Sequence, residues 1–111
     1  MAESVRAQSG KISYDDTVHF ERKDFYGQRY LEDDEGAGFG ALEVHIDGTH
    51  PKKTVEVETR MYLIRSGCGV FTIDGVDYDA DPYDMFLIRK GSTYSYTGQM
   101  TLFEVNIPLR A

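Results

Sequence analysis

The sequence of 111 residues contains no tryptophan, one cysteine and three prolines. Because Cys68 has no second thiol to pair with, an intrachain disulfide is excluded and a reducing compartment is favoured. No apolar run approaches the roughly 18 residues of a transmembrane helix, and no basic segment followed by an apolar one indicates a secretion signal. From these absences we expect a soluble, cytoplasmic protein that does not enter a membrane.

Basic residues are also scarce. The chain has 12 Lys and Arg against 19 Asp and Glu, which gives a formal net charge of −7 at pH 7. The sequence offers no basic stripe that could displace counterions from a phosphate backbone, so nucleic acid is not an expected partner. Acidic surfaces are ordinary for soluble domains, and the charge alone indicates no other partner.

Aromatic residues are plentiful instead. Eight Tyr and six Phe suit β-strands better than helices. The length is sufficient for one domain with its own hydrophobic core, and no internal repeat or low-complexity tract suggests a second one. We therefore predict a flexible tail over residues 1–10 and a single domain over residues 11–111.

Turn signals divide the chain at regular intervals. They lie at residues 47–48, 66–69, 74–75, 81–84, 90–92 and 98. The strongest is Asp74-Gly75 between two apolar runs, because a type I′ hairpin turn requires positive φ at both central positions. The spacing predicts roughly nine short strands and an all-β sandwich or barrel.

The order of these strands and turns resembles the cupin superfamily, whose members are small jelly-roll barrels, also called double-stranded β-helices. The matching features are, in order, Tyr62-Leu63-Ile64 before the glycines at 67 and 69, the run Val70 to Gly75, the run Asp81 to Ile88, the turn Lys90 to Thr93, and Phe103-Glu104-Val105. The resemblance implies a cupin-like barrel with a pocket inside and pairing of two copies into a homodimer.

Most members of that superfamily bind a divalent metal through three histidines and a glutamate, and the resemblance places other residues at those positions. Arg60 stands where the glutamate is expected, Thr54 and Glu56 stand on or near two histidine positions, and Tyr94 replaces the last histidine. A guanidinium carries a fixed positive charge and no lone pair, so we expect no metal and no other cofactor. It would instead attract a carboxylate or phosphate.

Side chains alternate between the two faces of a strand, which predicts what surrounds Arg60. If one strand runs through this region, Glu56 lies on the same face as Arg60 and next to it. We predict that a small-molecule ligand is bound by the inward side chains of Thr54, Glu56, Arg60, Tyr62, Tyr94 and Tyr96.

Three functions remain open at this point. The first is binding of a small polar or anionic metabolite, such as a sugar derivative or an organic acid. The second is a metal-free sugar isomerase, epimerase or lyase, in which Glu56 and Tyr94 supply a base and an acid. The third is a barrel that an Arg60–Glu56 ion pair fills, so that the protein acts only as a structural dimer module.

A different metal site is also conceivable. Glu43 and His45 share one face of a predicted strand, and His50 follows a turn shortly after them. Imidazole and carboxylate are suitable ligands for divalent metals. Scattered histidines are more often hydrogen-bonded surface residues, so the sequence leaves this alternative open.

Overall fold

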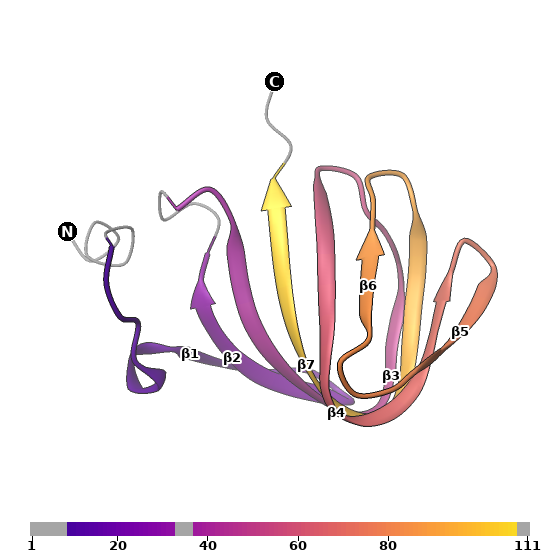
Figure 1. The fold of residues 1–111 in the computed structure, drawn as a ribbon, viewed down its shortest axis with the longest axis horizontal. Coiled ribbons are helices and arrows are strands. Elements are labelled where there is room, and N and C mark those ends of the chain that lie inside the picture. Colours follow the sequence, from indigo (N-terminus) through magenta and orange to yellow (C-terminus); the bar gives the residue numbers. More distant parts are fainter. Residues whose placement is uncertain (1–8, 33–36, 109–111) are drawn as a thin grey trace.

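The computed structural model describes residues 9–32 and 37–108, which leaves most of the predicted tail outside. The described residues form a short 3-10 helix, η1, and seven β-strands: η1 (Tyr14–Asp16), β1 (Val18–Glu21), β2 (Phe25–Leu31), β3 (Gly40–Thr54), β4 (Glu58–Ile73), β5 (Val76–Ala80), β6 (Met85–Ile88) and β7 (Thr93–Pro108). All strands pair antiparallel in the order β1-β2-β3-β7-β4-β5, and β6 pairs with the first part of β4 (Figure 1). Within these ranges no helix is long and apolar enough to cross a membrane.

The three longest strands give the fold its shape. β3, β4 and β7 run through positions that the sequence predicted as turns, with 15, 16 and 16 residues. Each strand bends at glycines with positive φ, namely Gly48 (136°), Gly67 (82°) and Gly98 (144°). The sheet therefore folds over into two facing layers, which Figure 1 shows as a U. The prediction of nine short strands was wrong because these glycines bend continuous strands instead of ending them.

Close backbone contact explains why glycines stand at the bend. A Cβ atom on Gly98 would lie 2.5 Å from the carbonyl oxygen of Cys68, and one on Gly67 would overlap the carbonyl of Gln99. Any side chain at these two positions would push β4 and β7 apart. The crossing of the two layers thus depends on residues that have no side chain.

Three of the predicted turns are confirmed, at residues 74–75, 81–84 and 90–92. Asp74 and Gly75 both have positive φ, 50° and 84°, and they close the β4–β5 hairpin. The turn before β6 is closed by a 3.0 Å hydrogen bond from the Asp84 N–H to the Asp81 carbonyl. Tyr83 within that turn has a φ of 73°, a left-handed conformation that glycine adopts more easily.

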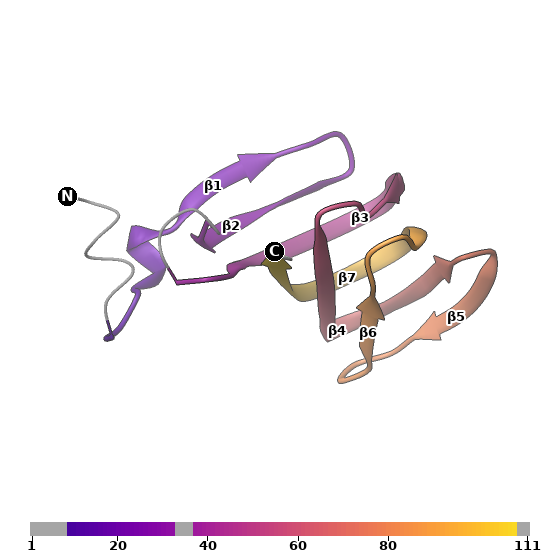
Figure 2. The ribbon, with the colours of Figure 1, turned by 90° about the horizontal axis from the view of Figure 1, so that it is seen from above.

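The core lies between the two layers. Its buried members are Leu42, Val44, Ile46, Val55, Tyr62, Ile64, Phe71, Ala80, Phe86, Ile88, Tyr94, Tyr96, Met100 and Leu102. The β1–β2 pair lies beyond β3, at the opposite edge of the sheet from β6 (Figure 2). The bend closes one end of the barrel.

Two connections form the other end. Val55, between β3 and β4, accepts a hydrogen bond from the Gly91 N–H (2.7 Å) and donates one to the Ser92 carbonyl (3.0 Å). The β3–β4 connection is therefore tied to the β6–β7 turn, and together they form the mouth of the barrel (Figure 1).

Candidate functional site

Polar side chains from both layers meet inside the barrel near its mouth. We call them the barrel cluster: His50, Glu58, Arg60, Tyr62, Tyr94, Tyr96, Glu104 and Asn106. The strand register brings them together, because Arg60 pairs with Asn106, Tyr62 with Glu104, and His50 with Tyr96. The bend in the sheet then places the Arg60–Asn106 and Tyr62–Glu104 pairs in one layer, opposite the His50–Tyr96 pair in the other.

Arg60 is the centre of the hydrogen-bonded part of the cluster. Its Nε donates to Glu58, its Nη1 donates to the Tyr94 hydroxyl at 2.7 Å, and the same Nη1 lies 3.7 Å from Glu104. Burial opposes the charge of the guanidinium, but the surrounding Tyr62, Tyr94 and Glu104 outweigh it and raise the pKa of Arg60. Arg60 is therefore permanently charged, and two carboxylates lie next to it.

Two tyrosines connect the layers across the barrel. The hydroxyl oxygens of Tyr62 and Tyr94 are 2.6 Å apart and share a hydrogen bond. Burial raises the pKa of both phenols. Both phenols therefore stay protonated at neutral pH and can donate as well as accept hydrogen bonds.

Glu104 is the only charged residue among the buried polar side chains of the described chain. It is 6% exposed and projects from β7. Burial raises the pKa of its carboxyl, while Arg60 partly offsets this effect. The prediction that Glu56 accompanies Arg60 was wrong, since Glu58 and Glu104 take that place.

His50 belongs to the cluster although the sequence did not single it out for the barrel interior. Its ring stacks on Tyr96 with 4.7 Å between centroids and on Tyr94 with 5.6 Å. Burial lowers the pKa of His50 to about 4, and the positive charges of Arg60 and Lys53 add to the effect. The imidazole is consequently neutral at physiological pH.

Three polar atoms of the cluster are buried without a hydrogen-bond partner in the described part of the chain. They are Nδ1 of His50, the hydroxyl of Tyr96 and Oδ1 of Asn106. Leaving such a group unpaired costs about 1–3 kcal/mol. Buried polar groups in folded proteins are normally paired with protein, water or a ligand, so these atoms mark where a polar molecule is expected to bind.

The structure separates Thr54 and Glu56 from the barrel interior. Thr54 ends β3 and shares a 2.7 Å hydrogen bond with Thr93, and Glu56 is exposed in the β3–β4 connection. The physical reason is Val55, which is 1% exposed and points into the core, so that its two neighbours point outward. The predicted single strand does not exist, because β4 begins only at Glu58.

Both residues line the entrance instead. A recess of about 360 Å³ at the mouth is lined by residues 53–58 and Arg60. Arg60 belongs to this recess and to the barrel cluster, so it connects the entrance to the interior. Of the six predicted ligand-binding residues, four therefore meet in the barrel and two lie at its entrance.

The alternative metal site is not formed. Glu43 and His45 contact each other on the outer face of the sheet, with 3.3 Å between Oε1 and Nε2, while His50 faces the interior. Across residues 9–32 and 37–108, no three His, Cys, Asp or Glu side chains converge on a point where they could hold a metal ion.

The donors of the barrel cluster do not fit the divalent metal that the resemblance associates with this fold. Arg60 has no lone pair to offer, and its charge repels a cation. Tyr94 stands where an imidazole is expected, and its raised pKa keeps it protonated. The one imidazole of the cluster, His50, stacks on Tyr94 and Tyr96. We therefore derive no chemistry through a metal.

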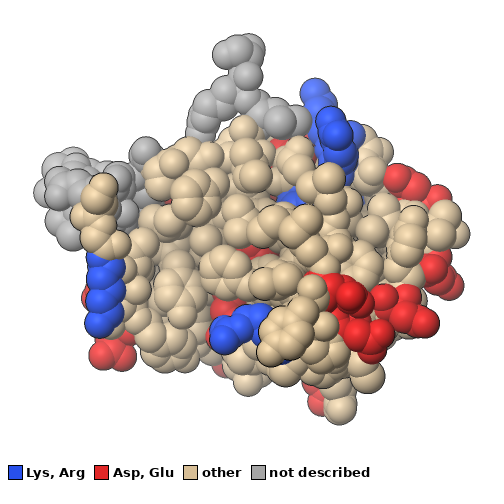
Figure 3. Space-filling view, in the orientation of Figure 1, with Lys and Arg blue, Asp and Glu red and all other residues tan. Residues whose placement is uncertain are grey.

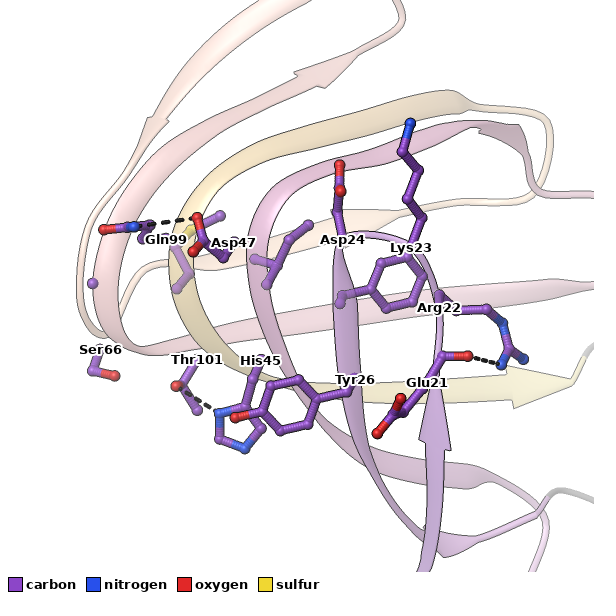
Figure 4. Close-up of a pocket in the computed structure, with 14 residues that line it drawn as sticks. Glu21, Arg22, Lys23, Asp24, Tyr26, His45, Asp47, Ser66, Gln99 and Thr101 are labelled. Carbon is purple, nitrogen blue, oxygen red and sulfur yellow. Dashed lines mark hydrogen bonds between the residues drawn. The ribbon is translucent and has the colours of Figure 1, made fainter.

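A second recess, of about 590 Å³, lies outside the barrel at the bend (Figure 4). His45 stacks on Tyr26 there and hydrogen-bonds Thr101 at 3.1 Å, and Gln99 donates to Asp47 at 3.2 Å. These polar groups already hydrogen-bond one another, so none of them needs a ligand to complete its hydrogen bonds. The barrel cluster is therefore the better candidate for a binding site.

Comparison with known proteins finds no matching family model and no matching curated protein for the sequence. Solved structures do match. The nucleoside dehydratase Pac13 of Streptomyces superposes with a TM-score of 0.79 at 16% identity, over 94% of this chain and 86% of that one. KdgF from Halomonas sp. superposes with a TM-score of 0.79 at 11% sequence identity, over 93% of this chain and 96% of that one.

The cupin domain of Schizosaccharomyces pombe Cnp3 gives a TM-score of 0.70 at 16% identity, over 79% of this chain and 67% of that one. Identities this low establish the architecture and leave the activity open. The protein is thus an all-β jelly roll with the cupin fold.

Proposed function

We propose that the barrel cluster and the recess at its mouth bind a small, neutral, polar metabolite. The observation that supports this proposal is the set of unpaired buried atoms on His50, Tyr96 and Asn106. A ligand with hydroxyl or carbonyl groups would complete their hydrogen bonds. A barrel filled only for structural reasons would have little need of polar atoms that lack partners.

The charges around Arg60 favour a neutral ligand over an anion. Glu58 and Glu104 both lie against the guanidinium, so two carboxyl groups face its single positive charge. The mouth recess adds Lys53 and Glu56, whose charges offset each other. An anion entering the barrel would meet two carboxylates as well as one guanidinium, so the expectation of an organic acid is replaced by that of a sugar-like or nucleoside-like compound.

The likeness to Pac13 supports this class of ligand. Structures of three Pac13 variants, two with a tyrosine replaced by phenylalanine and one with a histidine replaced by glutamine, contain uridine. Uridine is neutral, has several hydroxyl groups and is small enough for a barrel of this kind.

The spacing of the replaced Pac13 residues favours acid–base chemistry as a second candidate function. In Pac13 the histidine precedes the first tyrosine by 13 residues, and that tyrosine precedes the second by 34. In this chain His50 precedes Tyr62 by 12 residues and Tyr62 precedes Tyr96 by 34. These three residues lie together in the barrel, where His50 stacks on Tyr96 and the Tyr62 ring meets the Tyr96 ring edge-on.

The roles in such a reaction follow from the protonation states. Neutral His50 can accept a proton from a substrate carbon at Nδ1, and protonated Tyr96 can donate one to a departing hydroxyl, which leaves as water. The C–O bond breaks as a C=C bond forms between the two carbons. The proton held by His50 then passes to the Tyr96 phenolate, which restores both groups. This assignment replaces the predicted base Glu56, which lies outside the barrel.

Binding is tested by calorimetry with uridine, thymidine and D-glucose as neutral probes and uridine 5′-monophosphate and D-glucuronate as anionic ones. We expect at least one neutral probe to bind and each anion to bind at least about tenfold more weakly than its neutral counterpart. His50→Gln and Tyr96→Phe should each weaken binding about tenfold or more, which corresponds to roughly one or two lost hydrogen bonds.

His45→Gln is the matched control, since His45 is on the same strand and faces outward. An equal loss of affinity in His45→Gln and His50→Gln would place the site elsewhere. Tighter binding of the anions would refute the neutral class. If calorimetry detects no binding of any probe, and the NMR signals of the His50 ring do not shift when a probe is added, the proposal fails.

A further inference from the structure

Positive charge is concentrated at the mouth of the barrel. Lys52 and Lys53 lie at the end of β3, and Arg89 and Lys90 begin the turn between β6 and β7. All four side chains are exposed. We call them the basic rim: Lys52, Lys53, Arg89 and Lys90. The chain has only 12 basic residues, so a third of them lie at this one end of the molecule.

The fold brings the two halves of the rim together. Lys53 pairs with Tyr94, which joins the end of β3 to the start of β7. The backbone hydrogen bonds of Val55 with Gly91 and Ser92 then hold the β3–β4 connection against the β6–β7 turn. Figure 3 shows Lys and Arg side chains standing above these two connections. The rim therefore flanks the entrance to the barrel from both sides.

The charges of the rim are not neutralised within the molecule. Arg29, Arg60 and Arg65 each lie against a carboxylate, whereas none of the four rim side chains does so within residues 9–32 and 37–108. Residues 51–57 and 89–93 contain four basic residues and one acid, a net charge of +3, so the other 99 residues carry −10. The protein is thus polarised, and its mouth attracts negative charge.

The ligand proposed for the barrel does not account for the rim. Two carboxyl groups already face Arg60, so the interior disfavours an anion. The rim side chains are exposed and lie outside the barrel cluster. A negatively charged group that neutralises them therefore stays outside the barrel while the ligand enters it. An acidic surface of a second molecule, docked around the mouth, meets both requirements.

The surroundings of the rim favour a short acidic segment of protein over a nucleic acid. The Ser92 hydroxyl donates to Asp74 at 2.8 Å, which places the β4–β5 hairpin beside the β6–β7 turn. That hairpin continues into the exposed Asp77 and Asp79, and Figure 3 shows acidic side chains gathered there. A nucleic acid carries charge evenly along its length and would extend from the rim onto these acids. A short protein segment can end before it reaches them.

We propose that the basic rim binds an acidic segment of a partner protein, which presents the ligand to the mouth of the barrel. Complementary exposed charges speed the encounter and orient the partner. Val57 lines the mouth recess and is 71% exposed, so it offers the partner an apolar contact beside the charges. Binding of the partner rests on the rim alone, and only the presentation of a ligand rests on the proposed function.

The test uses a fluorescein-labelled peptide of about eight glutamates with two central leucines, titrated with the full chain and followed by fluorescence anisotropy. We expect a dissociation constant below about 100 μM in about 20 mM salt, and at least about tenfold weaker binding in about 200 mM salt, because salt screens exposed charges. Lys52→Glu combined with Lys90→Glu should weaken binding in low salt at least about tenfold.

Lys11→Glu combined with Lys23→Glu is the matched control. These two lysines are also exposed and lie outside the rim, and their replacement changes the net charge by the same amount. The control pair should change the affinity less than about threefold, because it leaves the local charge at the mouth intact. Equal weakening by the two pairs would overturn the rim as a docking surface, and so would absence of binding in low salt.

Two further measurements separate this proposal from the proposed function. The variant with Lys52→Glu and Lys90→Glu should bind the neutral probes as the wild type does, and His50→Gln should bind the acidic peptide as the wild type does. Failure of the barrel site and failure of the rim are therefore observed independently. An oligouridylate of about ten nucleotides that binds the rim more tightly than the peptide would assign the rim to nucleic acid and overturn the proposal.

Discussion

The inner and outer faces of β3 carry similar side chains with different properties. On the outer face His45 lies beside Glu43, which pairs with Arg65, and it stacks on Tyr26. On the inner face His50 stacks on two tyrosines near the Arg60 cluster. The outer side chains are mutually paired, and His45 and Arg65 are 33% and 58% exposed. The inner side chains His50 and Tyr96 are buried at atoms that have no partner within the described residues.

This difference shows that burial determines what a set of residue types can do. Water screens the outer charges and completes their hydrogen bonds. Inside the barrel the same groups have shifted pKa values and unpaired atoms, which are the properties that ligand binding and acid–base chemistry need. Matched substitutions on the two faces test this comparison directly.

The largest expected difference concerns the two arginines. Arg60→Met leaves the buried Glu104 without its cation and should lower the free energy of unfolding by about 3–5 kcal/mol. Arg65→Met removes a partner from Glu43 on the surface and should cost less than about 1 kcal/mol, since Arg65 is 58% exposed. Urea unfolding monitored by tyrosine fluorescence measures both, and equal losses would contradict the comparison.

The second difference concerns pH. The pKa of His50 is lowered from 6.5 to about 4, so the native state excludes its charged form. The stability that depends on neutral His50 is complete above pH 6.5 and is lost as the pH falls from 6.5 to 4. Between pH 6.5 and pH 4 we expect the free energy of unfolding to fall by about 2 kcal/mol on account of His50, after allowance for partial exposure of its ring.

His50→Gln should abolish that part of the loss, and His45→Gln should retain it. Unfolding curves at pH 4, 5, 6 and 7 give the free energy of unfolding of each variant as a function of pH. Burial also raises the pKa of Glu104, whose titration changes stability in the opposite direction, so the difference between variant and wild type is the quantity to compare. If the free energy of unfolding depends on pH in the same way in the wild type and in His50→Gln, the lowered pKa does not belong to His50.

The third comparison has the smallest individual effects and lies within the barrel. Tyr96→Phe removes a hydroxyl that has no partner and should stabilise the ligand-free protein by about 1 kcal/mol. Tyr62→Phe breaks the hydrogen bond with Tyr94 and should destabilise it by about 1–2 kcal/mol. Thermal unfolding of the two variants distinguishes them. Destabilisation by Tyr96→Phe would show that its hydroxyl is already satisfied.

The sequence was sufficient to predict the class of fold because its turn residues are local signals. Asp74-Gly75 forms a hairpin from its own conformational preference, and the order of the strands around it resembles that of a known fold. The glycines at the bend were misinterpreted, because a positive φ serves a bend in a continuous strand as well as a turn between two strands.

The interior could be predicted only in part. Arg60, Tyr62, Tyr94 and Tyr96 were found, but Thr54 and Glu56 were misplaced because Val55 turns inward. The sequence does contain one signal for a further residue: Glu104 lies in the middle of an apolar strand, and an acid in that position requires a buried partner. His50 gave no such signal, since a register shift follows it on β3.

The most direct test of the central claim, that a neutral imidazole with an unpaired Nδ1 atom lies inside this barrel, is NMR titration of the His50 ring between pH 3 and 8, alone and with uridine. We predict a pKa of about 4 and a shift of the Nδ1 resonance when uridine is added at pH 7. A ring that titrates near 6.5 and does not respond to uridine would contradict the account.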